Sequence, residues 1–81
     1  IIEYASLTCG HCKDFHDDVV VPLQSEFDSG RVRLLFRHYP LNKPALDAAL
    51  LLSCIPQNQA IEVLDNLFLH QETWAVIEEP L

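Results

Sequence analysis

The chain has 81 residues, which is enough for one small domain. Its formal net charge is -7, from 12 acidic against 5 basic residues, and an acidic chain repels nucleic-acid phosphates and anionic membrane surfaces. Hydrophobic residues make up 49% of it, so it can bury a core, but it has no apolar run of about eighteen residues that would cross a membrane. Two glycines are few for an all-β protein, so the composition favours helices mixed with a few strands.

The first two predicted elements are a strand and a helix. Residues 1–6 are β-branched and aromatic around a single charge, Glu3, which predicts a buried strand. From His11 the apolar period becomes helical and continues to about Phe27, with acidic residues on the opposite face. Pro22 lies inside this stretch and predicts a bent or two-part helix. The apolar stripe that should face the core consists of Cys12, Phe15, Val19 and Leu23.

A second strand is predicted over residues 31–37, after a turn in which Gly30 caps the preceding helix. Arg31, Arg33 and Arg37 alternate in this strand, and we expect them to pair with the acidic helix face or with solvent. A strand, a crossover helix and another strand make a βαβ unit, which implies a parallel pair. The fold class is therefore α/β.

The rest of the chain is predicted to be helical. Pro44 suits the first turn of a helix that continues through alanines and leucines to about Cys54. A further helix is expected over residues 58–70, because its apolar residues fall on one face. Trp74 then lies in a loop or short turn, and residues 78–81 look like the beginning of another helix.

Cys9 and Cys12 form a C-x-x-C motif between the first strand and the first helix. The first cysteine would lie at the helix N-terminus, where free N–H groups and the helix dipole favour a thiolate. The second would lie one turn further along, shielded but placed to attack a mixed disulfide formed by the first. We therefore predict that Cys9 is the nucleophile and Cys12 the resolving thiol.

Two further residues have candidate roles at this pair. His11 lies between the cysteines and would stabilise the Cys9 thiolate, and with it the reduced form, which predicts an oxidising poise. Glu3 lies in a strand that looks buried on both faces, where its pKa would be raised and it could take the proton from Cys12. The alternative for Glu3 is a carboxylate that points to solvent from a sheet edge.

The remaining cysteine and histidines suggest weaker roles. His16 borders the site at most and is expected on the helix surface, while His38 and His70 lie near element ends and should be paired or solvated. Cys54 is expected to be a small buried apolar residue, or else to pair with a cysteine beyond the chain.

The alternatives to redox chemistry are a metal-binding module, in which the two thiols hold zinc or copper, and a purely structural disulfide. Cys54 with His16, His38 or His70 could supply two more zinc ligands, although no second pair has metal-ligand spacing. Redox exchange itself requires no cofactor beyond the Cys9–Cys12 disulfide.

Residues 2–16 resemble the active-site segment of the DsbA family of thioredoxin-like proteins, and residues 33–41 resemble the strand that follows it. The helix that ends at Cys54 and the stretch from Asn66 to Trp74 resemble the start of that family's inserted helical region.

The resemblance implies a division of the chain into two parts. Residues 1–41 would be the N-terminal βαβ part of a thioredoxin-like domain, and residues 42–81 the first helices of the insertion. The family's later half, with a cis-proline loop and further strands, is not in the chain, so the thioredoxin fold is expected to be incomplete.

The resemblance also implies a function: a periplasmic or otherwise extracytoplasmic enzyme that introduces or reshuffles disulfides in exported proteins. Its partners would be cysteine-containing substrates and a redox recycling partner. Cys9 would be the attacking thiol, Cys12 the resolving thiol, His11 the thiolate stabiliser and Glu3 the buried acid. Gly10 replaces the proline usual in the oxidase motif and resembles the isomerase motif, so both activities stay open.

Overall fold

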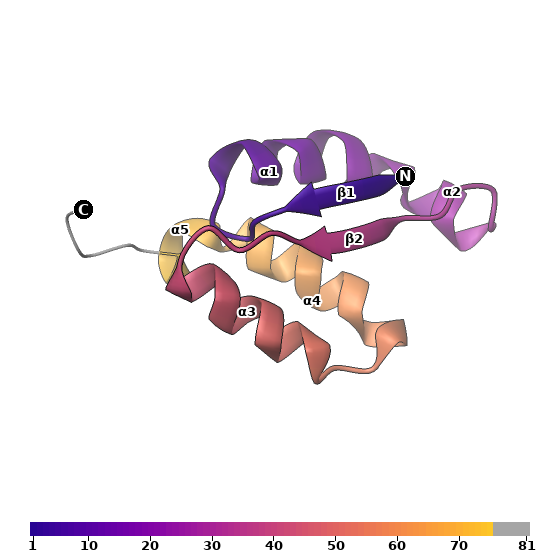
Figure 1. The fold of residues 1–81 in the computed structure, drawn as a ribbon. Helices are drawn as coiled ribbons and strands as arrows, with labels where there is room; N and C mark the ends of the chain where they lie inside the picture. The colour runs from indigo at the N-terminus through magenta and orange to yellow at the C-terminus, as the bar shows by residue number, and fades with distance from the viewer. Residues whose placement is uncertain (76–81) are drawn as a thin grey trace.

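The computed structural model describes residues 1–75, and its sheet consists of two parallel strands. Strand β1 (Ile2–Ala5) pairs with β2 (Leu35–His38), with Glu3 opposite Phe36. The parallel strand pair of the predicted βαβ unit is confirmed, and Figure 1 shows the connecting helix crossing one face of the sheet. The α/β class is therefore confirmed.

The second strand begins later than predicted, at residue 35 instead of 31. The N–H groups of Arg31 and Val32 donate to the carbonyl of Glu26, at 3.1 and 3.3 Å, so this segment closes the preceding helix instead of joining the sheet. The expected row of three arginines on one strand is therefore wrong. Only Arg37 lies in β2, and Arg31 pairs with the Glu26 carboxylate.

The crossover helix is bent, as predicted. Pro22 has no N–H to donate, and it lies in a short 3-10 turn where the α-helical pattern is interrupted. Gly30 has a φ of 80° and its N–H donates to the carbonyl of Phe27, which confirms it as the cap. The helix runs through α1 (Gly10–Phe15), a π-helical turn η1 (His16–Val20), the 3-10 turn η2 (Val21–Leu23) and α2 (Gln24–Asp28).

The π-helical turn changes which side chains the helix buries. Phe15 and Val19, predicted to face the core, are 40% and 36% exposed, whereas His16 and Val20 are 0% and 1% exposed. A π-helical turn holds more residues than an α-helical one, so the buried face continues from Cys12 in steps of four. The predicted stripe was therefore wrong at Phe15 and Val19, while Cys12 and Leu23 are half-buried.

Up to residue 75, three helices follow β2: α3 (Lys43–Ser53), α4 (Gln57–Leu69) and α5 (Gln71–Trp74). Asn42 caps α3 by accepting from the N–H of Ala45 at 3.1 Å, and Pro44 occupies the first turn, as predicted. The helix predicted to begin at residues 78–81 lies outside the described residues. No helix of residues 1–75 is both long enough and apolar enough to span a membrane.

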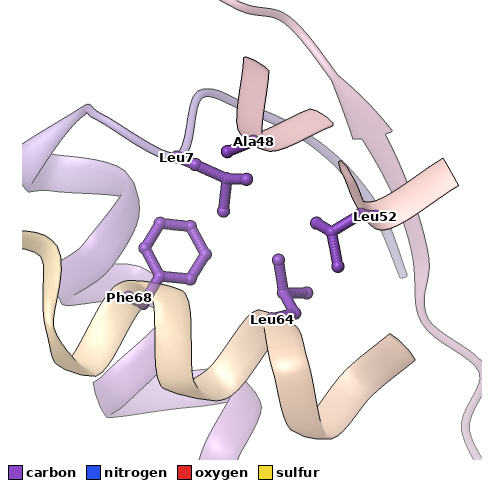
Figure 2. Packing of buried hydrophobic residues seen from close by; sticks show 5 residues of the cluster. All are labelled: Leu7, Ala48, Leu52, Leu64 and Phe68. Atoms are coloured by element: carbon purple, nitrogen blue, oxygen red, sulfur yellow. The ribbon is translucent and has the colours of Figure 1, made fainter. Parts of the chain in front are cut away.

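The core joins the loop that precedes the cysteines to the later helices. Leu7, between β1 and α1, is 1% exposed, and Figure 2 shows its side chain beside Phe68 and Ala48. Burying one such side chain contributes about 1.5–3 kcal/mol, so this packing fixes the position of the loop. The cluster consists of Leu7, Ala48, Leu52, Leu64 and Phe68.

Candidate functional site

Cys9 and Cys12 lie where β1 ends and the crossover helix begins. Cys9 is the N-cap of α1 with an extended backbone (φ -87°, ψ 125°), and its carbonyl accepts from the N–H of Lys13 at 3.1 Å. Cys12 lies one turn into the helix and packs against the core cluster. Both are free thiols and half-buried, so the motif has the strand–turn–helix position predicted for it.

The surroundings of Cys9 favour its thiolate. The backbone N–H of Cys12 is the main group that lowers the pKa of Cys9, and the Cys12 thiol and the backbone N–H of His11 add to it. Burial and the charge of Asp14 oppose this effect, but the pKa stays below its ordinary value. The first turn of the helix therefore acts as the hydrogen-bond donor set that a thiolate needs.

The surroundings of Cys12 have the opposite effect. Burial is the main cause that raises the pKa of Cys12, and the neighbouring Cys9 and the charge of Glu3 raise it further, while a backbone hydrogen bond with Ser6 lowers it. Between the two pKa values, Cys9 is ionised and Cys12 keeps its proton. The pair is therefore asymmetric in the sense that a nucleophile and a resolving thiol require.

His11 contributes to the site through its backbone. The residue is exposed, and its backbone N–H lowers the pKa of the Cys9 thiol. A stabilising role for the imidazole remains a prediction.

Glu3 is buried, with 8% of its surface exposed, and does not point to solvent. The reason given from the sequence was wrong, because β1 is buried on one face only: Ile2 and Tyr4 are 62% and 70% exposed. Burial raises the pKa of Glu3, and the nearby His16 lowers it. Neither carboxyl oxygen has a hydrogen-bond partner among the described residues, so a buried acid lies within electrostatic reach of Cys12.

His16 is a site residue whose position was predicted wrongly from the sequence. It was expected on the helix surface, but it is fully buried, with its ring 4.7 Å from that of Phe68. Its Nε2 lies 2.5 Å from Oδ1 of Asp65 in α4, and its Nδ1 is buried without a partner among residues 1–75. The spacing of four from Cys12 was the available signal, but only the π-helical turn keeps this position on the buried face.

Gln71 is a second residue that the sequence did not reveal. Its side-chain amide is buried and donates to the carbonyls of Leu7 and Cys9, at 2.9 and 3.0 Å. The loop before the motif is thereby held by α5, which is 62 residues away from Cys9 along the chain. No local pattern around Gln71 signals this contact.

The remaining candidates do not join the site. Cys54, predicted to be buried, is exposed because it follows the last residue of α3; His38 and His70 are also exposed. Within the described residues, no three His, Cys, Asp or Glu side chains are arranged to hold a metal ion. An open cavity of about 660 Å³ runs along β2 between α2 and α4, but neither Cys9 nor Cys12 lines it.

Comparisons with known proteins agree with this geometry. A family model described as "Thioredoxin" matches residues 1–79. A protein of Rickettsia conorii named "Putative protein-disulfide oxidoreductase" is 31% identical over 77 residues, covering 93% of this chain and 28% of the relative. The same name belongs to relatives in Rickettsia prowazekii (30% over 77 residues, 93% and 28% covered) and Rickettsia bellii (27% over 78 residues, 94% and 30% covered). The chain thus spans less than a third of these relatives, and no solved structure matches it.

Proposed function

Because the chain belongs to the thioredoxin family, we propose that Cys9 and Cys12 are a redox pair that exchanges disulfides with the cysteines of other proteins. The observation that carries the proposal is the asymmetry of the pair. Cys9 lies at the helix start with a lowered pKa, and Cys12 lies one turn behind it with a raised pKa. The name of the rickettsial relatives supports the same chemistry.

Exchange proceeds in two displacements. The Cys9 thiolate attacks one sulfur of a substrate disulfide, a Cys9–substrate bond forms, and the other substrate sulfur leaves as a thiolate that takes a proton from water. Cys12 then loses its proton and attacks the Cys9 sulfur, so the Cys9–Cys12 disulfide forms and the second substrate sulfur leaves. The substrate is reduced and the pair is oxidised; the reverse sequence introduces a disulfide into the substrate.

Glu3 is the proposed acceptor of the Cys12 proton. Its carboxylate is buried beneath the helix start, and burial raises its pKa from the ordinary carboxyl value toward that of a thiol. A closer match of pKa values makes the proton transfer more efficient. In the reverse direction, the protonated Glu3 returns the proton to the departing Cys12 thiolate.

The proposed direction in the cell is oxidation or isomerisation, in a DsbA-like enzyme. Groups that stabilise the Cys9 thiolate stabilise the reduced pair, which makes its disulfide a stronger oxidant. Such an enzyme would act on exported proteins in the periplasm or another extracytoplasmic compartment and would need a redox partner to recycle it. The resemblance of residues 2–16 to the DsbA active site supports this part of the proposal.

A glutathione redox titration of the full-length protein tests the proposal, with alkylated thiols counted by intact mass. We expect a reversible two-thiol step at Cys9 and Cys12, at a potential well above the thioredoxin value of about -270 mV. Cys54→Ser is the matched control and should leave the step unchanged. No exchange, or a zinc adduct that protects both thiols, would contradict the proposal.

A further inference from the structure

Three polar side chains lie beneath the cysteine pair and form what we call the buried polar cluster: Glu3, His16 and Asp65. They come from three elements, β1, η1 and α4, and His16 and Asp65 are 49 residues apart in the chain. Glu3 and His16 are almost completely buried, while the side chain of Asp65 is 37% exposed. The cluster therefore extends from the interior near Cys12 to the surface of α4.

The contact with Asp65 determines which nitrogen of His16 has the hydrogen. An ionised carboxylate only accepts hydrogen bonds, so Nε2, 2.5 Å from Oδ1 of Asp65, must be the donor. In the neutral imidazole the other nitrogen, Nδ1, is then a bare acceptor. This Nδ1 is buried and has no partner among residues 1–75, so its lone pair is available to accept a proton.

Glu3 also lacks a hydrogen-bond partner among residues 1–75. Both of its carboxyl oxygens are buried without a partner in the described part of the chain, and a proton on His16 would lower the pKa of Glu3. A protonated Glu3 would be a donor, which is what Nδ1 of His16 lacks. Phe36, opposite Glu3 in the strand register, and Phe68, against His16, have ring centroids 6.3 Å apart, so the two groups lie in the same part of the interior. Proton transfer between them requires a rotation of the Glu3 side chain or one bridging water to connect them.

We propose that His16, oriented by Asp65, is a positioning residue that carries protons between Glu3 and solvent. The inference rests on the proposed function, since it concerns the proton that Glu3 takes from Cys12. That proton passes from the Glu3 carboxyl to Nδ1 of His16 while the Nε2 proton passes to Asp65, which releases it to water. One proton leaves for each Cys12 thiolate formed, and His16 then has its hydrogen on Nδ1. When the Cys9–Cys12 disulfide is reduced again, a proton enters by the reverse route, which returns the hydrogen of His16 to Nε2 and a proton to Cys12.

The titratable groups around this route come from several elements. Cys12 of α1 influences Glu3, and Asp65 of α4 contacts His16. The side chains nearest the route from β2 and α4 are aromatic: Phe36 is opposite Glu3 in the strand register, and Phe68 lies against His16. His38 of β2 titrates as well; its ring lies 5.0 Å from that of Phe36, and burial lowers its pKa.

The test separates the two displacements kinetically in the full-length protein. Oxidised glutathione is the probe: the first rate is its attack by Cys9, and the second is the release of glutathione from Cys9 by Cys12. In His16→Gln and Asp65→Asn, we expect the first rate to stay within about twofold and the second to fall about tenfold near neutral pH, less than the direct loss of a general base. The decrease should vanish in alkaline solution, where Cys12 ionises without help. Asp47→Asn, which removes a surface pair with Lys43, is the matched control and should change neither rate.

The outcomes distinguish the inference from the proposed function. Wild-type protein that does not exchange with glutathione overturns the proposed function. Wild-type exchange together with unchanged second-step pH profiles in both variants overturns only the relay. If His16→Gln does not fold, the half-exposed Asp65→Asn decides the question. Nitrogen NMR of the imidazole in the reduced wild-type protein adds an independent test, because a His16 tautomer with its hydrogen on Nδ1 in that state would also overturn the relay.

Discussion

Cys9 of the cysteine pair and Glu3 of the buried polar cluster are six residues apart in the chain, yet their pKa values are shifted in opposite directions. The pKa of Cys9 is lowered, whereas that of Glu3 is raised. The pair is half-buried, and backbone N–H groups at the helix start lower the pKa of Cys9. In the cluster, Glu3 is buried and has no hydrogen-bond partner within residues 1–75, and desolvation raises its pKa. A nucleophile needs access and hydrogen-bond donors, whereas an acceptor for a thiol proton needs a less polar surrounding. The chain supplies both within a few residues by placing one on the loop and the other on the inward face of β1.

The largest expected effect is the loss of the nucleophile. Cys9→Ser should abolish exchange with glutathione, because a hydroxyl at this position does not ionise near neutral pH. Cys54→Ser should exchange at the wild-type rate, since Cys54 is exposed and lies outside the site. Stopped-flow or quenched alkylation of both variants measures the difference, and residual exchange in Cys9→Ser would mean that Cys12 attacks directly.

Phe68→Ala should remove packing from both the loop before the cysteine pair and the buried polar cluster. Phe68 is 0% exposed and contacts the His16 ring, so its truncation should lower the free energy of unfolding by about 3–5 kcal/mol. The adjacent Leu69 is 62% exposed, and Leu69→Ala should change stability by less than about 0.5 kcal/mol. Denaturant titration measures both, and similar values for the two variants would argue against the described core.

Glu3→Gln should affect the second displacement and leave the first nearly unchanged. The variant lacks the proton acceptor, so release of glutathione by Cys12 should slow about a hundredfold near neutral pH. The pKa of Cys12 should also fall, because the charge of Glu3 contributes to its rise. Alkylation of Cys12 as a function of pH checks this shift, and an unchanged profile would remove Glu3 from the mechanism.

The same variant should change how stability depends on pH. The pKa of Glu3 is raised from 4.5 in the folded chain, so the folded state holds this proton more tightly than the unfolded state does. The resulting stabilisation is full below the unfolded value and is lost as pH rises through the folded pKa. Relative to wild type, Glu3→Gln should therefore gain stability across that window. The measurement is the free energy of unfolding of wild type and Glu3→Gln, below and above this pH window. If Glu3 were not buried, the difference between the two proteins would be the same at both pH values.

His11→Ala should have the smallest effect of the series. Backbone N–H groups, with that of Cys12 first, already lower the pKa of Cys9, and an alanine keeps the backbone donor of residue 11. We expect the pKa of Cys9 to rise slightly and alkylation in mildly acidic solution to slow by a few-fold. A much larger loss would show that the imidazole, and not the helix start, is the main stabiliser of the thiolate.

Local patterns were sufficient for much of the fold. The structure confirms the two strands, although β2 begins at Leu35 and not at residue 31. It also confirms the bend at Pro22, the cap at Gly30 and the place of Pro44 in the first turn of α3. The position of the C-x-x-C motif between strand and helix followed in the same way. These features could be predicted because each depends on interactions within a few residues.

Other features depend on contacts that no local pattern contains. The burial of His16 requires a π-helical turn and a partner, Asp65, from a helix far along the chain. Gln71 reaches the carbonyl of Cys9 only because α5 lies against the loop. Cys54 was predicted to be buried, but it is exposed. It follows the last residue of α3, so the position of the helix end determines whether it faces the core.

The most direct test of the account is the pH dependence of alkylation of the two thiols in the reduced protein, resolved by peptide mass. The account predicts that Cys9 reacts at a pH below that of an ordinary thiol and Cys12 at a pH above it, with a range between them in which Cys9 alone is modified. Equal profiles, or earlier modification of Cys12, would contradict the assignment of nucleophile and resolving thiol.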